Sequence, residues 1–240
     1  MSEEVNIATI ENLVDGITTI DELTETTQSI SNKIDNILLE DIKERVCEIN
    51  IKKIGLRKCP EFAHDTDVGL DMYPTEVELI AYSGNSYKIQ LCDNMNENLI
   101  KIEKAEIAER IASPFLSRLK RFIKGKDYRL GWKRAKFNSG IAIEPNVDFF
   151  VIGAANSRVT KGDVCLQNGI GIIDPTYRGN IGFFYYNLNG GFIRDSILAL
   201  CNCCGQIFPA IRITPKISYK EELSETERGT GGFGSSAKVS

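Results

Sequence analysis

Residues 168–180 read NGIGIIDPTYRGN and lie between two runs of apolar and β-branched residues. An Asn-Gly pair before a short apolar run, followed by Asp-Pro-Thr, is typical of strands joined by tight turns. Similar runs broken by Gly, Pro and Asn occur on both sides, namely INIKKIGLRK (49–58), VELIAYS (77–83), GIAIEP (140–145), VDFFVIGA (147–154), GNIGFFYYN (179–187) and AIRITPKI (210–217). Many short strands at this spacing predict a mainly β protein, built as an antiparallel barrel or sandwich.

The first 50 residues have a different character. Ile30, Ile34, Leu38, Ile42 and Val46 recur at helical spacing, acids occupy the other faces, and no proline occurs. We therefore predict an acidic helical arm over residues 1–50, a β body over residues 51–222, and a Gly-rich mobile tail over residues 223–240.

A second helical pattern interrupts the strands at residues of about 102–126, IEKAEIAERIASPFLSRLKRFIKGK. Pro114 is expected to kink this helix or to divide it in two. Its apolar positions lie roughly four apart, at Ile107, Ile111, Phe115, Leu119 and Ile123. Basic residues follow, at Arg118, Lys120, Arg121, Lys124, Lys126, Arg129, Lys133, Arg134 and Lys136. Two interpretations stay open: a solvated face that balances the acidic arm, and a patch that binds a protein partner or nucleic acid.

Composition narrows the class of protein. The 240 residues carry a formal net charge of -4, with no leader-like N-terminus and no run of eighteen apolar residues, so we expect no membrane association and a cytoplasmic location. Cys201, Cys203 and Cys204 lie in an apolar stretch and are expected to be reduced core thiols, with a zinc site as the alternative. The single histidine, His64, makes a Ser-His-Asp mechanism improbable.

Four segments offer groups for chemistry on a phosphate ester. The tail RGTGGFGSS (228–236) flanks one aromatic, Phe233, with glycines and places Arg228 before them. Glycine-rich backbone wraps closely around phosphates, and arginine binds their charge. Asp174 follows a strand, where a carboxylate can orient a water or can simply cap a turn. DVGLDMYP (67–74) offers Asp71 for a hydrated divalent cation, and ANSRVTKGD (155–163) offers Ser157.

In this order, DVGLDMY, NSRVTKGDVCLQNGIGIIDPTYRGN and RGTGGFGSS resemble the first, second, third and fifth motifs of trimeric dUTPases, in the dUTPase/dCTP deaminase superfamily. The resemblance spans roughly residues 50–80 and 137–236. It implies a distorted jelly-roll β-barrel with the helical arm and insertion as additions, and hydrolysis of dUTP to dUMP and pyrophosphate with Mg²⁺. It also implies a homotrimer in which the tail of one subunit closes a site between two others.

The resemblance assigns roles to the acidic and hydroxyl residues. Asp71 matches the aspartate that holds waters of the Mg²⁺ on the triphosphate. Ser157 matches the serine that contacts the phosphates near the scissile bond. Asp174 matches the carboxylate that bonds the deoxyribose 3′-hydroxyl and orients the attacking water, and Tyr177 matches the residue that packs under the sugar.

The same resemblance assigns the substrate contacts. Uracil is expected to be read mainly by main-chain groups of the hairpin near Asn168 and Gly171, and Arg228 to meet the γ-phosphate. Phe233 matches the aromatic that stacks on uracil when the tail closes. The other tail residues expected at the substrate are Gly231, Gly232, Gly234 and Ser235.

Two motifs depart from the family pattern. Asn156 stands where motif two has its arginine, and Arg158 follows where a small residue is expected. Motif four keeps only Gly205, with Gln206 as a stand-in for the missing amide. These departures leave open a dUTPase-like regulatory protein that binds nucleotide and a partner. A dCTP deaminase is disfavoured because Phe184 and its neighbours offer no carboxylate.

Overall fold

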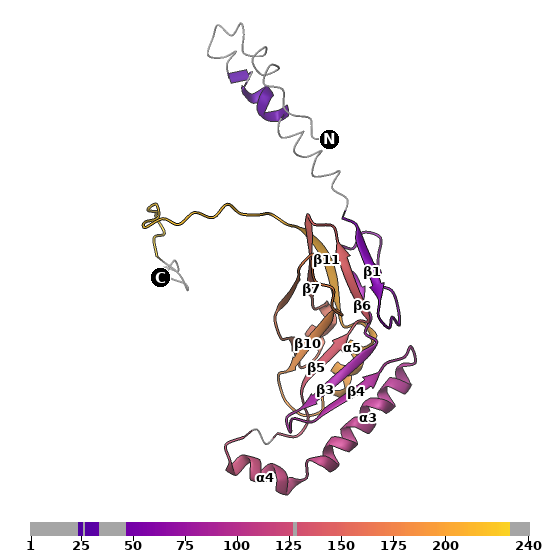
Figure 1. Cartoon of the computed structure of the whole chain (residues 1–240). Helices are drawn as coiled ribbons and strands as arrows, with labels where there is room; N and C mark the ends of the chain where they lie inside the picture. Colours follow the sequence, from indigo (N-terminus) through magenta and orange to yellow (C-terminus); the bar gives the residue numbers. More distant parts are fainter. Residues whose placement is uncertain (1–23, 26, 34–46, 127–128, 231–240) are drawn as a thin grey trace.

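The computed structural model of the chain describes residues 24–25, 27–33, 47–126 and 129–230. Its strands form three antiparallel sheets, so the predicted mainly β class is confirmed (Figure 1). A two-stranded sheet pairs β1 (Ile49–Lys53) with β6 (Ile141–Pro145). A five-stranded sheet has the order β4 (Ser86–Gln90), β3 (Glu76–Ala81), β5 (Trp132–Asn138), β10 (Gly182–Asn187) and β8 (Val164–Leu166). A four-stranded sheet has the order β2 (Leu70–Met72), β11 (Gly205–Ile211), β7 (Phe149–Ala154) and β9 (Ile170–Ile173).

The core forms where the apolar faces of these sheets meet. Along β3, Val77, Leu79 and Ala81 are buried while the residues between them are more exposed, which is the period-two pattern of a strand. Trp132 is fully buried, and its ring makes edge contacts with Tyr87 and Phe192 at centroid distances of 5.5 and 5.1 Å. Edge contacts between aromatic rings stabilise a specific packing geometry, in addition to the stabilisation that comes from burying the rings.

The predicted insertion is two helices, α3 (Met95–Ala112) and α4 (Phe115–Ile123), divided at Pro114. The helical segment begins at Met95, earlier than the predicted residue of about 102. Asn94 caps it, because its Oδ1 accepts hydrogen bonds from the main-chain N–H groups of Asn96 and Glu97 at 3.0 and 3.3 Å. The Asn-rich sequence before Ile102 therefore encodes a helix start rather than a loop.

The face of α3 that packs on the body carries buried acids. Glu109 is almost fully buried and accepts hydrogen bonds from Asn85 Nδ2 and Tyr87 Oη at 2.9 and 3.0 Å. Burial by itself raises the pKa of Glu106, but hydrogen bonds from Arg110 and Arg194 outweigh that effect and lower it. Since Arg194 begins α5 (Arg194–Asn202), this ion pair joins the insertion to the body.

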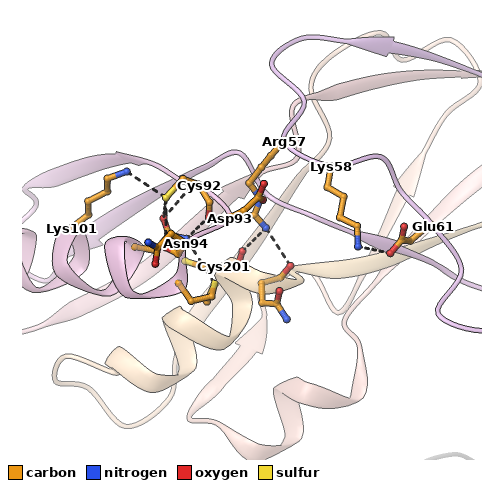
Figure 2. Close-up of polar contacts among 11 residues, drawn as sticks. Arg57, Lys58, Glu61, Cys92, Asp93, Asn94, Lys101 and Cys201 are labelled. Atoms are coloured by element: carbon orange, nitrogen blue, oxygen red, sulfur yellow. Dashed lines mark hydrogen bonds and ion pairs between the residues drawn. The ribbon is translucent and has the colours of Figure 1, made fainter.

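Arg57 joins three segments that are distant in the sequence (Figure 2). Its Nη1 donates to the carbonyl of Cys92 at 3.2 Å, and its Nη2 donates to the carbonyls of Cys201 and Asn202 at 2.9 and 3.4 Å. Its Nε lies 3.5 Å from Asp93. The last carbonyls of a helix lack partners within the helix, so Arg57 supplies donors to the C-terminal end of α5. The residues held in this way lead directly into β11.

The outermost described segments, residues 24–25 and 27–33 at one side and 212–230 at the other, lie apart from the sheets (Figure 1). Residues 24–25 and 27–33 are helical, which agrees with the helical periodicity predicted for the arm, while the rest of the arm before residue 47 lies outside the described residues. Residues 212–230 extend from β11 with exposed side chains. Among the helices of the described chain, none has the length and apolar character needed to cross a membrane.

Candidate functional site

The β8–β9 turn begins the site. Gly169 turns the chain with a positive φ of 67°, and its N–H donates to the carbonyl of Leu166 at 3.0 Å. Asn168 precedes this glycine in the turn. Because β8 belongs to the five-stranded sheet and β9 to the four-stranded sheet, the turn crosses from one sheet to the other. The tight turn expected at the Asn-Gly pair is therefore present, but β8 pairs with β10 and β9 with β7, so the turn joins the edges of two sheets and is not a β-hairpin.

A cavity of about 230 Å³ opens beside this turn. It brings together four residues predicted from the sequence: Asn168, Gly171, Asp174 and Tyr177. Other lining residues come from β7 and β10 and from the segment after the Asp174 turn, namely Gly153, Asn180, Ile181, Gly182 and Phe183. A polar end and an apolar wall in one concave site are typical of a small-molecule pocket.

The turn after β9 positions Asp174 and Tyr177. The N–H of Tyr177 donates to the carbonyl of Asp174 at 3.0 Å, and the Tyr177 hydroxyl donates to the carbonyl of Asn180 at 3.2 Å. The tyrosine ring lies over Gly179, where an added Cβ would come within 2.3 Å of its hydroxyl oxygen. Arg178 forms an ion pair with Glu144 and donates to the carbonyl of Pro175. The tyrosine is thus held by its own turn.

A second group of predicted residues surrounds Asp71. Gln206 lies directly opposite Asp71 on the paired strands β11 and β2, and Ala154 lies opposite Gln206 on β7. Ser157 begins the short 3-10 helix η1 (Ser157–Lys161), which follows β7. The stand-in predicted for motif four, Gln206, is therefore beside the predicted metal carboxylate.

The altered second motif also meets Asp71. The side chain of Asn156 caps η1 by accepting from the N–H of Arg158 at 3.1 Å, and its Nδ2 donates to Cys203 Sγ at 3.0 Å. The Arg158 guanidinium then reaches Asp71, with Nη2 3.9 Å from Oδ2. The positive charge of the Arg158 guanidinium therefore lies next to the Asp71 carboxylate, although the residue at the expected motif position is an asparagine.

The two groups lie on opposite faces of the four-stranded sheet. Asp71, Gln206, Ala154 and Ile170 form one row across the sheet, while Gly171 is the next residue of β9 after Ile170. Residues directly opposite one another share a face, and successive residues of a strand alternate between faces. The cavity residue Gly171 therefore lies on the face opposite to Asp71. Within a single chain, the pocket and the Asp71 group do not converge.

The predicted core thiols lie at the end of α5 and just before β11. Cys201, Cys203 and Cys204 are fully buried, so their predicted burial is confirmed. Burial raises the pKa of Cys203, and the nearby charge of Asp71 raises it further. Among the described residues, no group of three or more His, Cys, Asp and Glu side chains is arranged to hold a metal ion.

The predicted tail contacts are only partly within the described residues. Arg228 lies in an exposed turn at residues 227–230. Gly231, Gly232, Phe233, Gly234 and Ser235 lie outside the described residues. Sequence reasoning missed Asn180 and Gly153, which line the cavity, although Asn180 ends the segment TYRGN that was singled out.

Comparison with known proteins places this arrangement in a family. No family model matches the chain. A deoxyuridine 5′-triphosphate nucleotidohydrolase of Alkaliphilus metalliredigens is 28% identical over 189 residues, covering 78% of this chain and 95% of the relative. The enzyme of Escherichia phage T5 is 31% identical over 104 residues, covering 43% of this chain and 69% of the relative. The chain belongs to the deoxyuridine 5′-triphosphate nucleotidohydrolase (dUTPase) family.

dUTPases are enzymes, so the predicted enzyme class and family are confirmed. The dUTPase of Paramecium bursaria Chlorella virus 1 is a further relative, 30% identical over 100 residues, with 69% of its length covered. The chain also aligns with a solved structure of a Staphylococcus bacteriophage 80alpha dUTPase with dUpNHpp. That alignment has 16% identity and a TM-score of 0.46, and it covers 80% of this chain and 99% of the phage protein.

Proposed function

We propose that this dUTPase family member hydrolyses dUTP to dUMP and pyrophosphate. The observation that carries the proposal is the cavity at the β8–β9 turn, where Asn168, Gly171, Asp174 and Tyr177 converge from one continuous motif. The cavity has room for a nucleoside, an apolar wall for a base and one carboxylate for a water. The relatives named above are nucleotidohydrolases of deoxyuridine triphosphate.

In the proposed complex, uracil is read mainly by main-chain groups of β9. This strand is at the edge of its sheet and pairs with β7, and no strand of the described part of the chain pairs with its other edge. Main-chain donors and acceptors at such an edge match the imide edge of uracil without needing a charged side chain. Tyr177 packs under the deoxyribose and disfavours a 2′-hydroxyl.

Asp174 is proposed to orient a water and accept its proton while the water attacks the α-phosphate. The bond to the β-phosphate oxygen breaks, so the products are dUMP and pyrophosphate. This reaction depends chiefly on positioning and on stabilising phosphate charge. We propose that the charge on the phosphates is stabilised by Ser157, Arg158, Arg228 and the tail glycines.

Asp71 fits a Mg²⁺ ion that is bound together with the triphosphate. Mg²⁺ usually keeps several waters and binds through one or two carboxylates plus substrate phosphates, so a single aspartate suffices. Bound there, the ion would neutralise charge on the phosphates. Gln206, opposite Asp71, would hold a coordinated water or a phosphate oxygen by its amide.

We further propose that the site is shared between subunits of a homotrimer. The argument is that Asp71 and Gly171 take opposite faces of one sheet, and that within one chain Asp71 does not line the cavity that Gly171 and Asp174 line. The exposed segment 212–230 would carry the tail toward a neighbouring subunit.

The first experiment measures pyrophosphate release from dUTP, dCTP, dTTP and UTP with Mg²⁺, together with deamination of dCTP. Release from dUTP alone is expected. Binding of dUTP without release would favour the regulatory alternative, in which Arg158, paired with Asp71, would compete with the metal for that carboxylate.

A second experiment tests the shared site by co-expressing Asp71→Asn and Asp174→Asn chains. Each variant alone is expected to be inactive, while random mixed trimers should recover roughly a quarter of wild-type turnover, because that fraction of sites pairs two intact carboxylates. Mixed assemblies that remain inactive would show that both residues must come from one chain.

A further inference from the structure

Helices α3 and α4 present an apolar stripe to solvent. The residues that pack α3 on the body are Asn98, Ile102, Ala105, Glu106 and Glu109. The large apolar side chains lie on the other side of the helix and continue along α4. We call them the α3–α4 stripe, and they are 41–75% exposed: Ile100, Ile107, Ile111, Phe115, Leu116, Leu119 and Ile123. A helix normally buries its apolar face, so this stripe is suited to a partner.

The α4 half of the stripe is flanked by charge of one sign. Residues 115–126 contain five basic and no acidic residues. Arg121 Nη2 donates to Ser113 Oγ at 2.7 Å, and the Arg118 guanidinium lies 6.0 Å from the Phe115 ring centroid. The side chains of Lys120 and Lys124 are exposed. An occupant of this surface must therefore combine apolar side chains with negative charge.

The N-terminal segment of the chain has this composition. Residues 1–46 contain eleven acidic and three basic residues, together with eight isoleucines and four leucines. Its apolar residues Ile30, Ile34, Leu38 and Ile42 repeat at helical spacing, and the described residues 24–25 and 27–33 are helical. We infer that the α3–α4 stripe binds the acidic N-terminal segment, residues 1–46, of a second copy of this chain, as an amphipathic helix laid against an apolar surface.

The position of the chain ends favours a second copy over the same chain. Figure 1 shows β1, into which the N-terminal segment leads, at one end of the molecule and α4 at the other. Residues 24–25 and 27–33 lie beyond β1, away from α4. In an assembly, the N-terminal segment of one copy can meet α4 of the next without crossing its own sheets.

Zero-length carbodiimide cross-linking of the full chain tests this inference, because the reagent joins lysine to carboxylate only in direct contact. Equal amounts of ¹⁴N- and ¹⁵N-labelled protein are denatured together, refolded and cross-linked, and peptides are identified by mass spectrometry. We expect mixed-isotope peptides that link Lys120 or Lys124 to acids of residues 1–46. Only same-isotope links, or none, would overturn the inference; a control sample checks that subunits exchange.

Two sets of variants separate docking from random contact. Leu116→Ser with Leu119→Ser keeps both lysines, and it should reduce the mixed-isotope links at least tenfold by removing the apolar contact. Lys216→Glu with Lys220→Glu is the charge control away from α4 and should leave those links unchanged.

Links that survive the double serine change would overturn docking. Protection of α4 from hydrogen exchange only by phosphatidylglycerol vesicles would overturn it in favour of a lipid surface. These residues lie outside the proposed catalytic site, so dUTP turnover tests the proposed function separately.

Discussion

Arg158 Nη2 lies 3.9 Å from Asp71 Oδ2, although these residues are 87 positions apart and the expected motif arginine is replaced by Asn156. The one-turn helix η1 brings the guanidinium back to the carboxylate, and Asn156 caps that helix. Relative to the family motif, the arginine is therefore two positions later in the chain, at 158 in place of 156, and a positive charge still lies beside Asp71.

Replacing Arg158 by alanine tests whether this displaced cation serves catalysis. We expect kcat/KM for dUTP to fall about tenfold to a hundredfold, because a hydrogen bond to a charged group contributes about 1.5–3 kcal/mol. Arg158→Lys should recover only part, since lysine cannot form two parallel bonds to phosphate. Steady-state pyrophosphate assays measure both, with exposed Lys216→Ala as the control. A faster Arg158→Ala enzyme would mean that the arginine instead obstructs Asp71.

The Asp174→Asn variant tests the proposed base. Asparagine keeps the shape of the side chain but cannot accept the proton of the attacking water, so kcat should fall by about 10²–10⁴. Binding of dUTP, measured by calorimetry, should change little. The matched variant Asp148→Asn, on an exposed loop, should retain activity. Turnover of Asp174→Asn at the normal rate would remove Asp174 from the role of base.

Deleting residues 228–240 tests the tail. The deletion removes Arg228 and the Gly-rich segment with Phe233, so turnover of dUTP should be lost. The proposed homotrimer should persist on size-exclusion chromatography with light scattering, because the three sheets remain. A truncated protein with full activity would show that the tail has no part in the site.

The hydrogen bonds of Arg57 are expected to stabilise the fold. Arg57→Ala removes the side-chain donor of the Cys201 carbonyl and one of the two donors of the Cys92 carbonyl, which keeps Asn98 Nδ2, and we expect the free energy of unfolding to drop by about 2–3 kcal/mol. Arg57→Lys should recover little, since one ammonium cannot serve both segments. Urea denaturation provides the measurement, and exposed Lys52→Ala should stay within about 0.5 kcal/mol of the native chain. Equal stability of Arg57→Ala and the native chain would contradict the proposed clamp.

Burial of Cys201 predicts a loss of stability at alkaline pH. Burial raises the pKa of its thiol from 9.0 to about 12, so above pH 9 the unfolded chain loses this proton while the folded chain keeps it. The contribution of Cys201 is fully present below pH 9 and declines as pH rises toward about 12. The free energy of unfolding of Cys201→Ser, which does not titrate there, should fall less steeply over this range. Equal slopes would refute the assignment.

The sequence by itself determined the features that depend on neighbouring residues. Asn168 and Gly169 encode a tight turn, the segment from Asp174 to Tyr177 encodes the next one, and Pro114 divides the insertion, because each acts through local backbone geometry. The order of the motifs was enough to name the family. Cys201, Cys203 and Cys204 were predicted to be buried because their surroundings are apolar in the sequence itself.

Tertiary structure decided which groups meet. Hydrophobic periodicity predicted a helix in the insertion but could not show that Glu106 and Glu109 pack inward, because their partners Arg194, Asn85 and Tyr87 come from other elements. The pairing of Arg158 with Asp71 likewise depends on distant strands. The placement of Asp71 and Gly171 on opposite faces of one sheet follows from strand register, which is set by long-range pairing and not by either residue's neighbours in the sequence.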